Sequence, residues 1–101
     1  MANRNRGSNI QGAGFTSDEI ESVWAKAHEI RGQLAYDVYG NQIKHDDYGN
    51  VRSQYGWEID HKHPVARKGT DTLRNLQPLQ WQENRAKGDT YPYKKQKVYD
   101  D

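Results

Sequence analysis

The stretch GWEIDHKHPVARKGTDTLRNLQPLQWQENRAKGD, Gly56–Asp89, is the most informative part of this 101-residue chain. At its beginning, "WEIDHKHPV", apolar and polar residues alternate well enough to predict a strand that carries Asp60 and His61. Neighbouring residues of a regular strand point to opposite faces. If Asp60 and His61 serve one site, a bend or bulge must bring them together, or they act from two sides of a ligand.

The rest of the stretch predicts a loop, a returning strand and a helix. "ARKGTDT" is a basic loop with Gly69 as its turn residue. "LRNLQ" predicts the returning strand, with Leu73 packed inward and Pro78 ending the pairing. "QWQENRAKG" predicts a short helix that Gly88 closes. The order is therefore strand, loop, strand, helix.

Upstream, a longer helix is predicted from Phe15 to about Arg31. Thr16 is a suitable N-cap, and Glu19 three residues on completes a capping box. Gly32 is a suitable stop. The apolar residues that recur at helical spacing are Ile20, Val23, Trp24, Ala27 and Ile30. This stripe predicts core packing.

Between the two regions, Gly40-Asn41 predicts a two-residue hairpin turn that joins Val38-Tyr39 to Gln42-Ile43. Residues 46–50 predict a further turn. The three tryptophans, Trp24, Trp57 and Trp81, are expected to form much of the core, since aromatic burial contributes much energy per residue.

The chain length fits one small domain, which we expect over residues 15–91 with its core at 56–89. Residues 1–14 are rich in Gly, Asn and Arg and predict a flexible tail. Residues 92–101 are expected to form a second flexible tail, docked at its start through Tyr91 and Tyr93. The fold class is predicted to be α+β, with the N-terminal helix and a short hairpin packed on the core.

Composition excludes several classes of site. With no cysteine, disulfides and Cys-type zinc sites are impossible. There is no apolar run near 18 residues and no signal-peptide pattern at the start, so no membrane partner is expected and the cytoplasm is the expected location. Residues 51–97 contain ten Lys or Arg against five Asp or Glu, which favours a polyanionic partner.

The combination of Asp60-His61 in "EIDHKHPV", Asn75 in "LRNLQPL" and Asn84 in "ENRAKGD" resembles the HNH nuclease motif, the ββα-metal site of many phage, homing, toxin and CRISPR-associated endonucleases. The loop "KGTDTLRNLQ" also resembles the family's connection. This resemblance covers about a third of the chain, and more loosely most of residues 15–90. It implies a metal-dependent endonuclease that hydrolyses DNA and leaves a 5′-phosphate and a 3′-hydroxyl.

The resemblance also implies roles for these residues. His61 is the general base, since an imidazole accepts a proton near neutral pH. Asp60 and Asn84 hold one divalent ion, and their oxygen atoms suit Mg²⁺ best, with Mn²⁺ also suitable. Asn75 completes the catalytic set by holding the His61 region in place. Many relatives have His where this chain has Asn84, which favours Mg²⁺ over Zn²⁺ or Ni²⁺.

Basic residues near the motif are expected to contact nucleic acid, most readily double-stranded DNA. They are Arg85, Lys87, Arg67 and Lys68. His63 shares a strand face with His61 and is a further candidate for metal or substrate contact. Many relatives also bind a structural zinc through Cys-x-x-Cys pairs, and the matching positions here look like Gln80 and Glu83, so that zinc is absent.

Two other functions stay open. The first is a non-catalytic nucleic-acid-binding module that keeps the fold, with affinity from its basic half. The second is a zinc protein that uses His45, His61 and His63, which requires these three residues to converge. A protein partner that guides cleavage is also compatible with the sequence, which contains no element for reading a DNA sequence.

Overall fold

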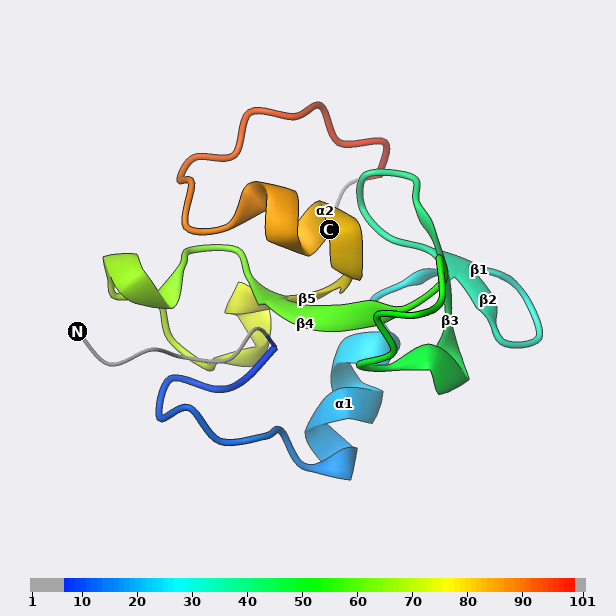
Figure 1. Ribbon diagram of the computed structural model, residues 1–101, viewed down its shortest axis with the longest axis horizontal. Coiled ribbons are helices and arrows are strands. Elements are labelled where there is room, and N and C mark those ends of the chain that lie inside the picture. Colours follow the sequence, from blue (N-terminus) through cyan, green and yellow to red (C-terminus); the bar gives the residue numbers. More distant parts are fainter. Residues whose placement is uncertain (1–6, 100–101) are drawn as a thin grey trace.

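The computed structural model describes residues 7–99, which form two short α-helices and two small antiparallel sheets (Figure 1). The elements are α1 (Ser17–Trp24), β1 (His28–Arg31), β2 (Leu34–Tyr36), β3 (Gln42–Lys44), β4 (Trp57–His61), β5 (Leu76–Gln80) and α2 (Trp81–Lys87). One sheet has the order β1-β2-β3 and the other pairs β4 with β5. The predicted α+β class is confirmed.

The strand, loop, strand, helix order predicted for residues 56–89 is found in β4, β5 and α2. The two strands pair without a break in register, from Trp57 opposite Gln80 to His61 opposite Leu76. Helix α2 begins directly after β5, where the Gln80 side chain accepts hydrogen bonds from the backbone N–H groups of Gln82 and Glu83. These bonds satisfy donors that the first helical turn leaves without an intrahelical partner.

Two details of the returning strand were wrongly predicted. Leu73 does not pack inward: it lies in a single 3₁₀ turn, Leu73–Asn75, and its side chain is 49% exposed. Pro78 does not end the strand, because it pairs with Ile59 inside β5. A sheet of two strands leaves the outer side of β5 without a partner strand, so the missing N–H of proline costs no ladder hydrogen bond.

Helix α1 has the predicted start but not the predicted end. The Thr16 hydroxyl accepts from the Glu19 N–H, and the Glu19 carboxylate accepts from the Thr16 N–H, so the capping box is confirmed. The helix ends at Trp24, and residues 28–31 pair with β2 as strand β1. Gly32, with a φ of 57°, turns this hairpin and does not stop a helix. Helix propensity is a weak preference that tertiary pairing with β2 overrides here.

The predicted hairpin around Gly40-Asn41 exists, but its strands are β2 and β3 and its loop is residues 37–41. The Asp37 carboxylate organises this loop by accepting hydrogen bonds from the backbone N–H groups of Tyr39, Asn41 and Gln80. Burial nevertheless raises the pKa of Asp37 above its usual value, since desolvation outweighs these bonds. The tight two-residue turn lies at Gly32-Gln33 instead.

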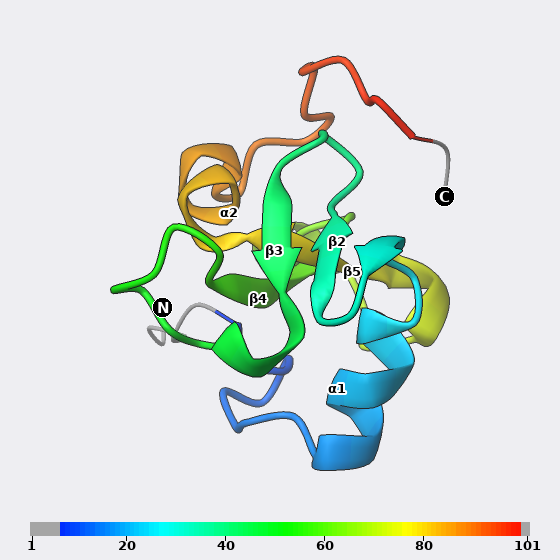
Figure 2. The same cartoon turned by 90° about the vertical axis from the view of Figure 1, so that its right-hand side faces the viewer.

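The core lies mainly between α1 and the β4–β5 hairpin, around Trp57, which is fully buried. Trp24 packs against Trp57 with ring centroids 5.2 Å apart, as predicted. Trp81 is only partly buried, outside both core clusters, and its indole N–H donates to Ser53. Figure 1 shows α1 and α2 on opposite faces of the β4–β5 hairpin, and Figure 2 shows the three-stranded sheet beside it.

The segments predicted as tails make contacts where the structure describes them. Ser8 is buried, and the Ile10 N–H lies 3.2 Å from both carboxylate oxygens of Asp71. The last described segment contacts α2, the loop after β2, and β1. Tyr93 and Lys95 donate hydrogen bonds to Glu83. The Val98 N–H donates to the Val38 oxygen, and the Tyr99 ring stacks on His28. Residues 1–6 and 100–101 lie outside the described part, and the flexibility of both tails stays a prediction. None of the helices in residues 7–99 has the length and apolarity needed to cross a membrane.

Candidate active site

A small pocket opens where β4 ends beside the second half of α2. Its lining comes from residues far apart in the sequence: Gly7, Ile59, Asp60, His61, Pro64, Asn84, Gly88 and Asp89. The structure therefore brings together three of the predicted site residues, Asp60, His61 and Asn84. The antiparallel pairing of β4 with β5 and the direct entry into α2 make this approach possible, since α2 folds back across β4.

Asp60 faces α2 and is buried, with both of its carboxylate oxygens in hydrogen bonds. Oδ2 accepts from Gln77 Nε2 at 2.9 Å, and Oδ1 accepts from Lys87 Nζ at 3.1 Å. Burial raises the pKa of the Asp60 carboxyl above its usual value, while Lys87 and Gln77 act in the opposite direction. Asp60 thus sits in a low-dielectric site beside one compensating positive charge.

Asn84 lines the pocket, and Glu58 holds its side-chain amide. The Asn84 Nδ2 donates to Glu58 Oε1 at 2.8 Å, and both side chains are buried. This bond occupies the nitrogen side of the amide and leaves Oδ1 without a hydrogen-bond partner among the described residues. Glu58 and Asp60 are two residues apart on β4, so both point to the α2 face.

His61 points to the other face of β4, as strand geometry requires when the register is regular. Its Nε2 lies 2.8 Å from Asp71 Oδ1, and its ring centroid lies 6.1 Å from that of Phe15. The residue is only 3% exposed. No bulge turns His61 toward Asp60, so the two residues approach the pocket from different sides.

Two residues that line the pocket, His61 and Asn84, each carry a side-chain atom without a hydrogen-bond partner among residues 7–99. Within residues 7–99, the only fully enclosed side-chain N or O atom without a hydrogen-bond partner is Gln77 Oε1. The Nδ1 of His61 and the Oδ1 of Asn84 also lack partners there, so neither atom is fully enclosed. One is a nitrogen base and the other a neutral oxygen donor, the two atom types that a metal-assisted hydrolysis needs.

The Asn75 side chain joins the two ends of the loop between β4 and β5. Its side chain accepts from the His63 N–H at 2.8 Å and donates to the backbone oxygens of His63 and Thr70. The loop between β4 and β5 is thereby closed directly after His61. Gly69 contributes to the same closure, because a Cβ there would lie 1.7 Å from the His63 oxygen. The effect of Asn75 on catalysis stays a prediction.

The four predicted nucleic-acid contacts have different surroundings. Arg67 and Lys68 are exposed in the loop after β4, and Arg85 is partly exposed beside Glu58 and Trp81. Lys87 is buried and donates to Asp60 and to the His61 backbone oxygen. The surface contact predicted for Lys87 is therefore not what the structure shows, because the buried Asp60 carboxylate draws the ammonium inward.

The three histidines of the zinc hypothesis do not converge. His45 lies against Glu21 and Trp24, whereas His61 contacts Asp71. The imidazole of His63 lies 2.6 Å from the Arg67 backbone oxygen and stacks on a tyrosine. Residues 7–99 contain no group of three His, Cys, Asp or Glu side chains placed to hold a metal ion.

The oxygen donors at the pocket fit a hard divalent ion with few protein ligands. Mg²⁺ is often bound through one or two carboxylates and completes its shell with water and substrate phosphate oxygens. Asp60 would supply one carboxylate, and Asn84 would supply a neutral amide oxygen. The Lys87 ammonium on Asp60 Oδ1 would have to share this carboxylate with the ion.

The sequence did not indicate the residues that support the site. They are Glu58, which holds Asn84, Gln77, which donates to Asp60, and Asp71, which contacts His61. The two-residue spacing from Glu58 to Asp60 places them on one strand face, and this signal was readable. Asp71 lies in a loop whose course depends on tertiary contacts, so no local pattern indicates its role.

Comparison with known proteins gives one match, to a family model. No curated protein and no solved structure matches the chain. The sequence model of one family, described as HNH endonuclease, matches residues 45–90, a segment that contains β4, β5 and α2. Residues 45–90 of this chain therefore belong to the HNH endonuclease family.

Proposed function

We propose that the chain is a metal-dependent endonuclease that hydrolyses phosphodiester bonds of DNA at the pocket between β4 and α2. The observation that carries this proposal is the convergence of Asp60, His61 and Asn84 on one pocket. Nucleases of this family act on nucleic acid and generally use a divalent metal ion. The exposed basic residues of the loop after β4 are suited to phosphate contacts.

In the proposed reaction, His61 accepts the proton of the attacking water through Nδ1, while Asp71 holds the ring from Nε2. Asp60 and Asn84 would hold the ion, most suitably Mg²⁺. A bound divalent ion stabilises the negative charge that develops on the phosphate and on the leaving oxygen. Glu58 keeps the Asn84 oxygen directed at the pocket, and Asn75 holds the loop that follows His61.

A second candidate function is a nucleic-acid-binding module without catalysis. The position of the Lys87 ammonium on Asp60 favours it, because a cation already compensates this carboxylate. The near-complete burial of His61 favours it as well. Such a module would bind through its exposed basic residues and would not depend on the metal ligands.

Cleavage of supercoiled plasmid in Mg²⁺, Mn²⁺ or EDTA distinguishes the two functions. The native chain is compared with His61→Ala and with His28→Ala, a matched control in which the lost imidazole stacks on Tyr99. We expect metal-dependent cleavage that His61→Ala abolishes and His28→Ala retains. Cleavage that survives in a folded His61→Ala variant would contradict the assigned base. DNA binding without cleavage by the folded native chain would favour the binding module.

A further inference from the structure

Tyr91 has an unusual environment among the aromatic residues of this chain. All eleven aromatic side chains lie in the described part, and Tyr91 is the only one that is exposed, at 46%. Burying an aromatic ring stabilises a small domain, so leaving one half outside gives up that contribution. Aromatic rings that are accessible to a ligand serve as stacking surfaces for bases in sites that bind single-stranded nucleic acid.

His63 holds the Tyr91 ring in place. The two rings stack with centroids 4.4 Å apart and an interplanar angle of 13°. His63 is itself fixed, since its backbone N–H donates to Asn75 and its Nε2 lies 2.6 Å from the Arg67 oxygen. The Tyr91 hydroxyl forms no hydrogen bond with the described residues. One face of Tyr91 is therefore backed by a fixed ring, and the residue is 46% exposed.

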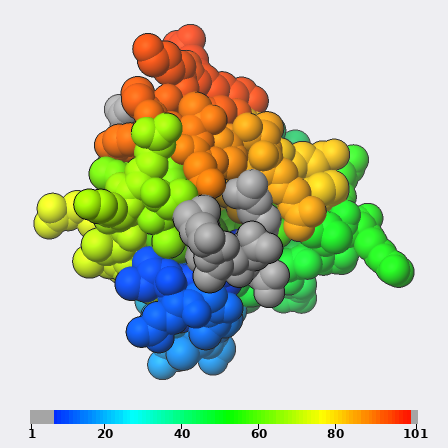
Figure 3. Space-filling view, turned by 60° about the vertical axis from the view of Figure 1, so that its left-hand side comes forward, coloured from blue at the N-terminus to red at the C-terminus, as the bar shows by residue number. Residues whose placement is uncertain are grey.

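The Tyr91 ring lies next to the proposed active site. Asp89, two residues earlier, lines the pocket, and two residues of extended chain span at most about 7 Å. The Arg67 Nε donates to the Asp89 oxygen at 3.2 Å, which joins the loop after β4 to the segment after α2. Figure 3 shows these two segments against each other on one face of the molecule.

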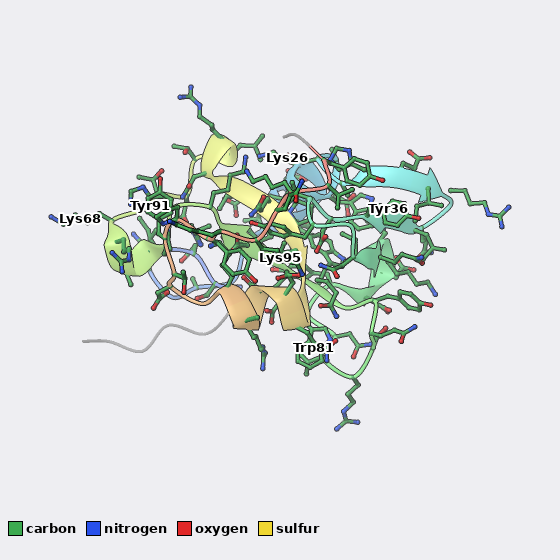
Figure 4. The ribbon with its side chains drawn as sticks, turned by 90° about the horizontal axis from the view of Figure 1, so that it is seen from above. Lys26, Tyr36, Lys68, Trp81, Tyr91 and Lys95 are labelled. Atoms are coloured by element: carbon green, nitrogen blue, oxygen red, sulfur yellow. The ribbon has the colours of Figure 1, made fainter. Side chains whose placement is uncertain are left out.

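Positive charge accompanies the exposed ring. Arg67 and Lys68 are both exposed in the loop that includes His63. Lys68 is the only non-glycine residue with a positive φ in the described chain, at 72°, a conformation that most side chains avoid. Figure 4 shows the Lys68 and Tyr91 side chains at the same end of the molecule.

We propose that Tyr91, backed by His63, is a stacking platform for an unpaired base of a nucleic acid strand that enters the pocket. Arg67 and Lys68 would contact the phosphates of this strand, as in binding sites that combine basic grooves with aromatic rings. A base inside a duplex has both faces covered by its neighbours, so the platform selects single-stranded or locally opened substrate. The proposal rests on the proposed function and specifies the form of its substrate.

Binding of fluorescent oligonucleotides in EDTA tests the platform without cleavage. The probes are a single-stranded 12-mer and the blunt duplex of the same sequence, and the variants are Tyr91→Ala, Tyr91→Phe and Tyr36→Ala. Tyr36 is the matched control, since its ring stacks on Tyr99 and Figure 4 shows it at the opposite end of the molecule. We expect Tyr91→Ala to weaken single-strand binding about 5- to 100-fold, the range for one stacked base.

Tyr91→Phe and Tyr36→Ala should bind the single strand as the native chain does, and Tyr91→Ala should leave duplex binding nearly unchanged. Upfield shifts of the Tyr91 ring protons on addition of the single strand would report the stacking directly. Unchanged single-strand binding by Tyr91→Ala, or an equal loss on duplex, would overturn the proposal. Because no metal is present, a failure of plasmid cleavage would leave this result intact, and the reverse also holds.

Discussion

At the residue scale, Asp60 and Lys87 form a buried ion pair beside the proposed metal site. Both side chains are almost fully enclosed, and Lys87 Nζ also donates to the His61 backbone oxygen. A buried pair contributes little net stability relative to apolar residues, but each charge depends on the other. Burial raises the pKa of Asp60 above its usual value, and the Lys87 charge and the Gln77 hydrogen bond oppose this rise.

Lys87→Met should therefore lower the free energy of unfolding by about 3–5 kcal/mol, since it leaves the Asp60 carboxylate uncompensated. Arg85→Met on the same helix is the matched control. Arg85 is about half exposed and pairs with Glu58 at 3.3 Å, so its loss should cost less than about 1 kcal/mol. Urea unfolding of both variants measures the difference, and equal losses would show that burial does not distinguish the two pairs.

Glu58 holds the side chain of Asn84, a proposed metal ligand. Glu58→Ala leaves the Asn84 amide free to rotate, and we expect the Mg²⁺ concentration for half-maximal cleavage to rise about 10- to 100-fold. Glu58→Gln retains an oxygen that accepts from Asn84 Nδ2 and should recover most of this loss. The measurement is cleavage rate against Mg²⁺ concentration for folded variants. An unchanged Mg²⁺ dependence in Glu58→Ala would remove Asn84 from the metal site.

At the element scale, the loop between β4 and β5 determines the surroundings of His61. The loop supplies Asp71, which contacts the imidazole, and Asn75, which closes the loop on His63. The loop also folds tightly on itself, since a Cβ on Gly69 would overlap the His63 backbone oxygen. The site thus depends on a loop that the Asn75 amide holds closed and that needs a residue without a side chain at Gly69.

Gly69→Ala should destabilise the protein by about 1–3 kcal/mol or more, because the added methyl group meets backbone that cannot move aside. Gly14→Ala is the control, since nothing lies within 4 Å of its added Cβ, and it should change stability by less than about 0.5 kcal/mol. Thermal unfolding of the two variants compares them. Equal stabilities would contradict the close approach of Gly69 to the His63 backbone oxygen.

At the scale of the whole molecule, the segment after α2 is joined to the body through Glu83. This carboxylate accepts from Asn41, from the Tyr93 hydroxyl at 2.6 Å and from Lys95 at 2.5 Å. Burial alone would raise the pKa of Glu83, but the bonds from Lys95, Tyr93 and Asn41 outweigh it, and the pKa lies below its usual value. One side chain of α2 therefore connects the loop after β2 with the C-terminal segment.

A carboxyl with a lowered folded-state pKa stabilises the protein above its unfolded pKa and loses this contribution as pH falls through the folded value. Glu83→Gln should thus have a lower melting temperature than the native chain at pH 7. The difference should shrink as pH falls below the ordinary value of 4.5 for Glu. Thermal unfolding between pH 7 and pH 3 measures this, and a constant difference would show that the charge of Glu83 is irrelevant.

The dependence of stability on pH above 10 tests the Tyr93–Glu83 hydrogen bond independently. The hydrogen bond to Glu83 raises the pKa of Tyr93 from 10.0 to about 12. A group with a raised folded-state pKa contributes stability below its unfolded pKa, and this contribution disappears as pH rises from 10 toward 12. Tyr93→Phe should remove that alkaline loss, and an unchanged alkaline profile would mean that the Tyr93–Glu83 bond does not stabilise the fold.

The sequence by itself determined the α+β class, the strand, loop, strand, helix order of residues 56–89, and the family. The capping box of α1 and the stop at Gly88 were also readable. These features depend on local chemistry: alternation along a strand, hydrogen bonds at a helix end, and residue spacing. Asp60, His61 and Asn84 were named from the resemblance to the HNH motif, and the structure places all three at one pocket.

Only the tertiary structure decided where α1 ends, that Pro78 lies inside β5, and which partners surround the site. Helical spacing continues to Ile30, yet pairing with β2 converts residues 28–31 to a strand. The contacts of Asp71 with His61, and of Lys87 with Asp60, join residues ten or more positions apart. Such contacts depend on how loops and helices pack, and hydrogen bonding and burial then outweigh local preference.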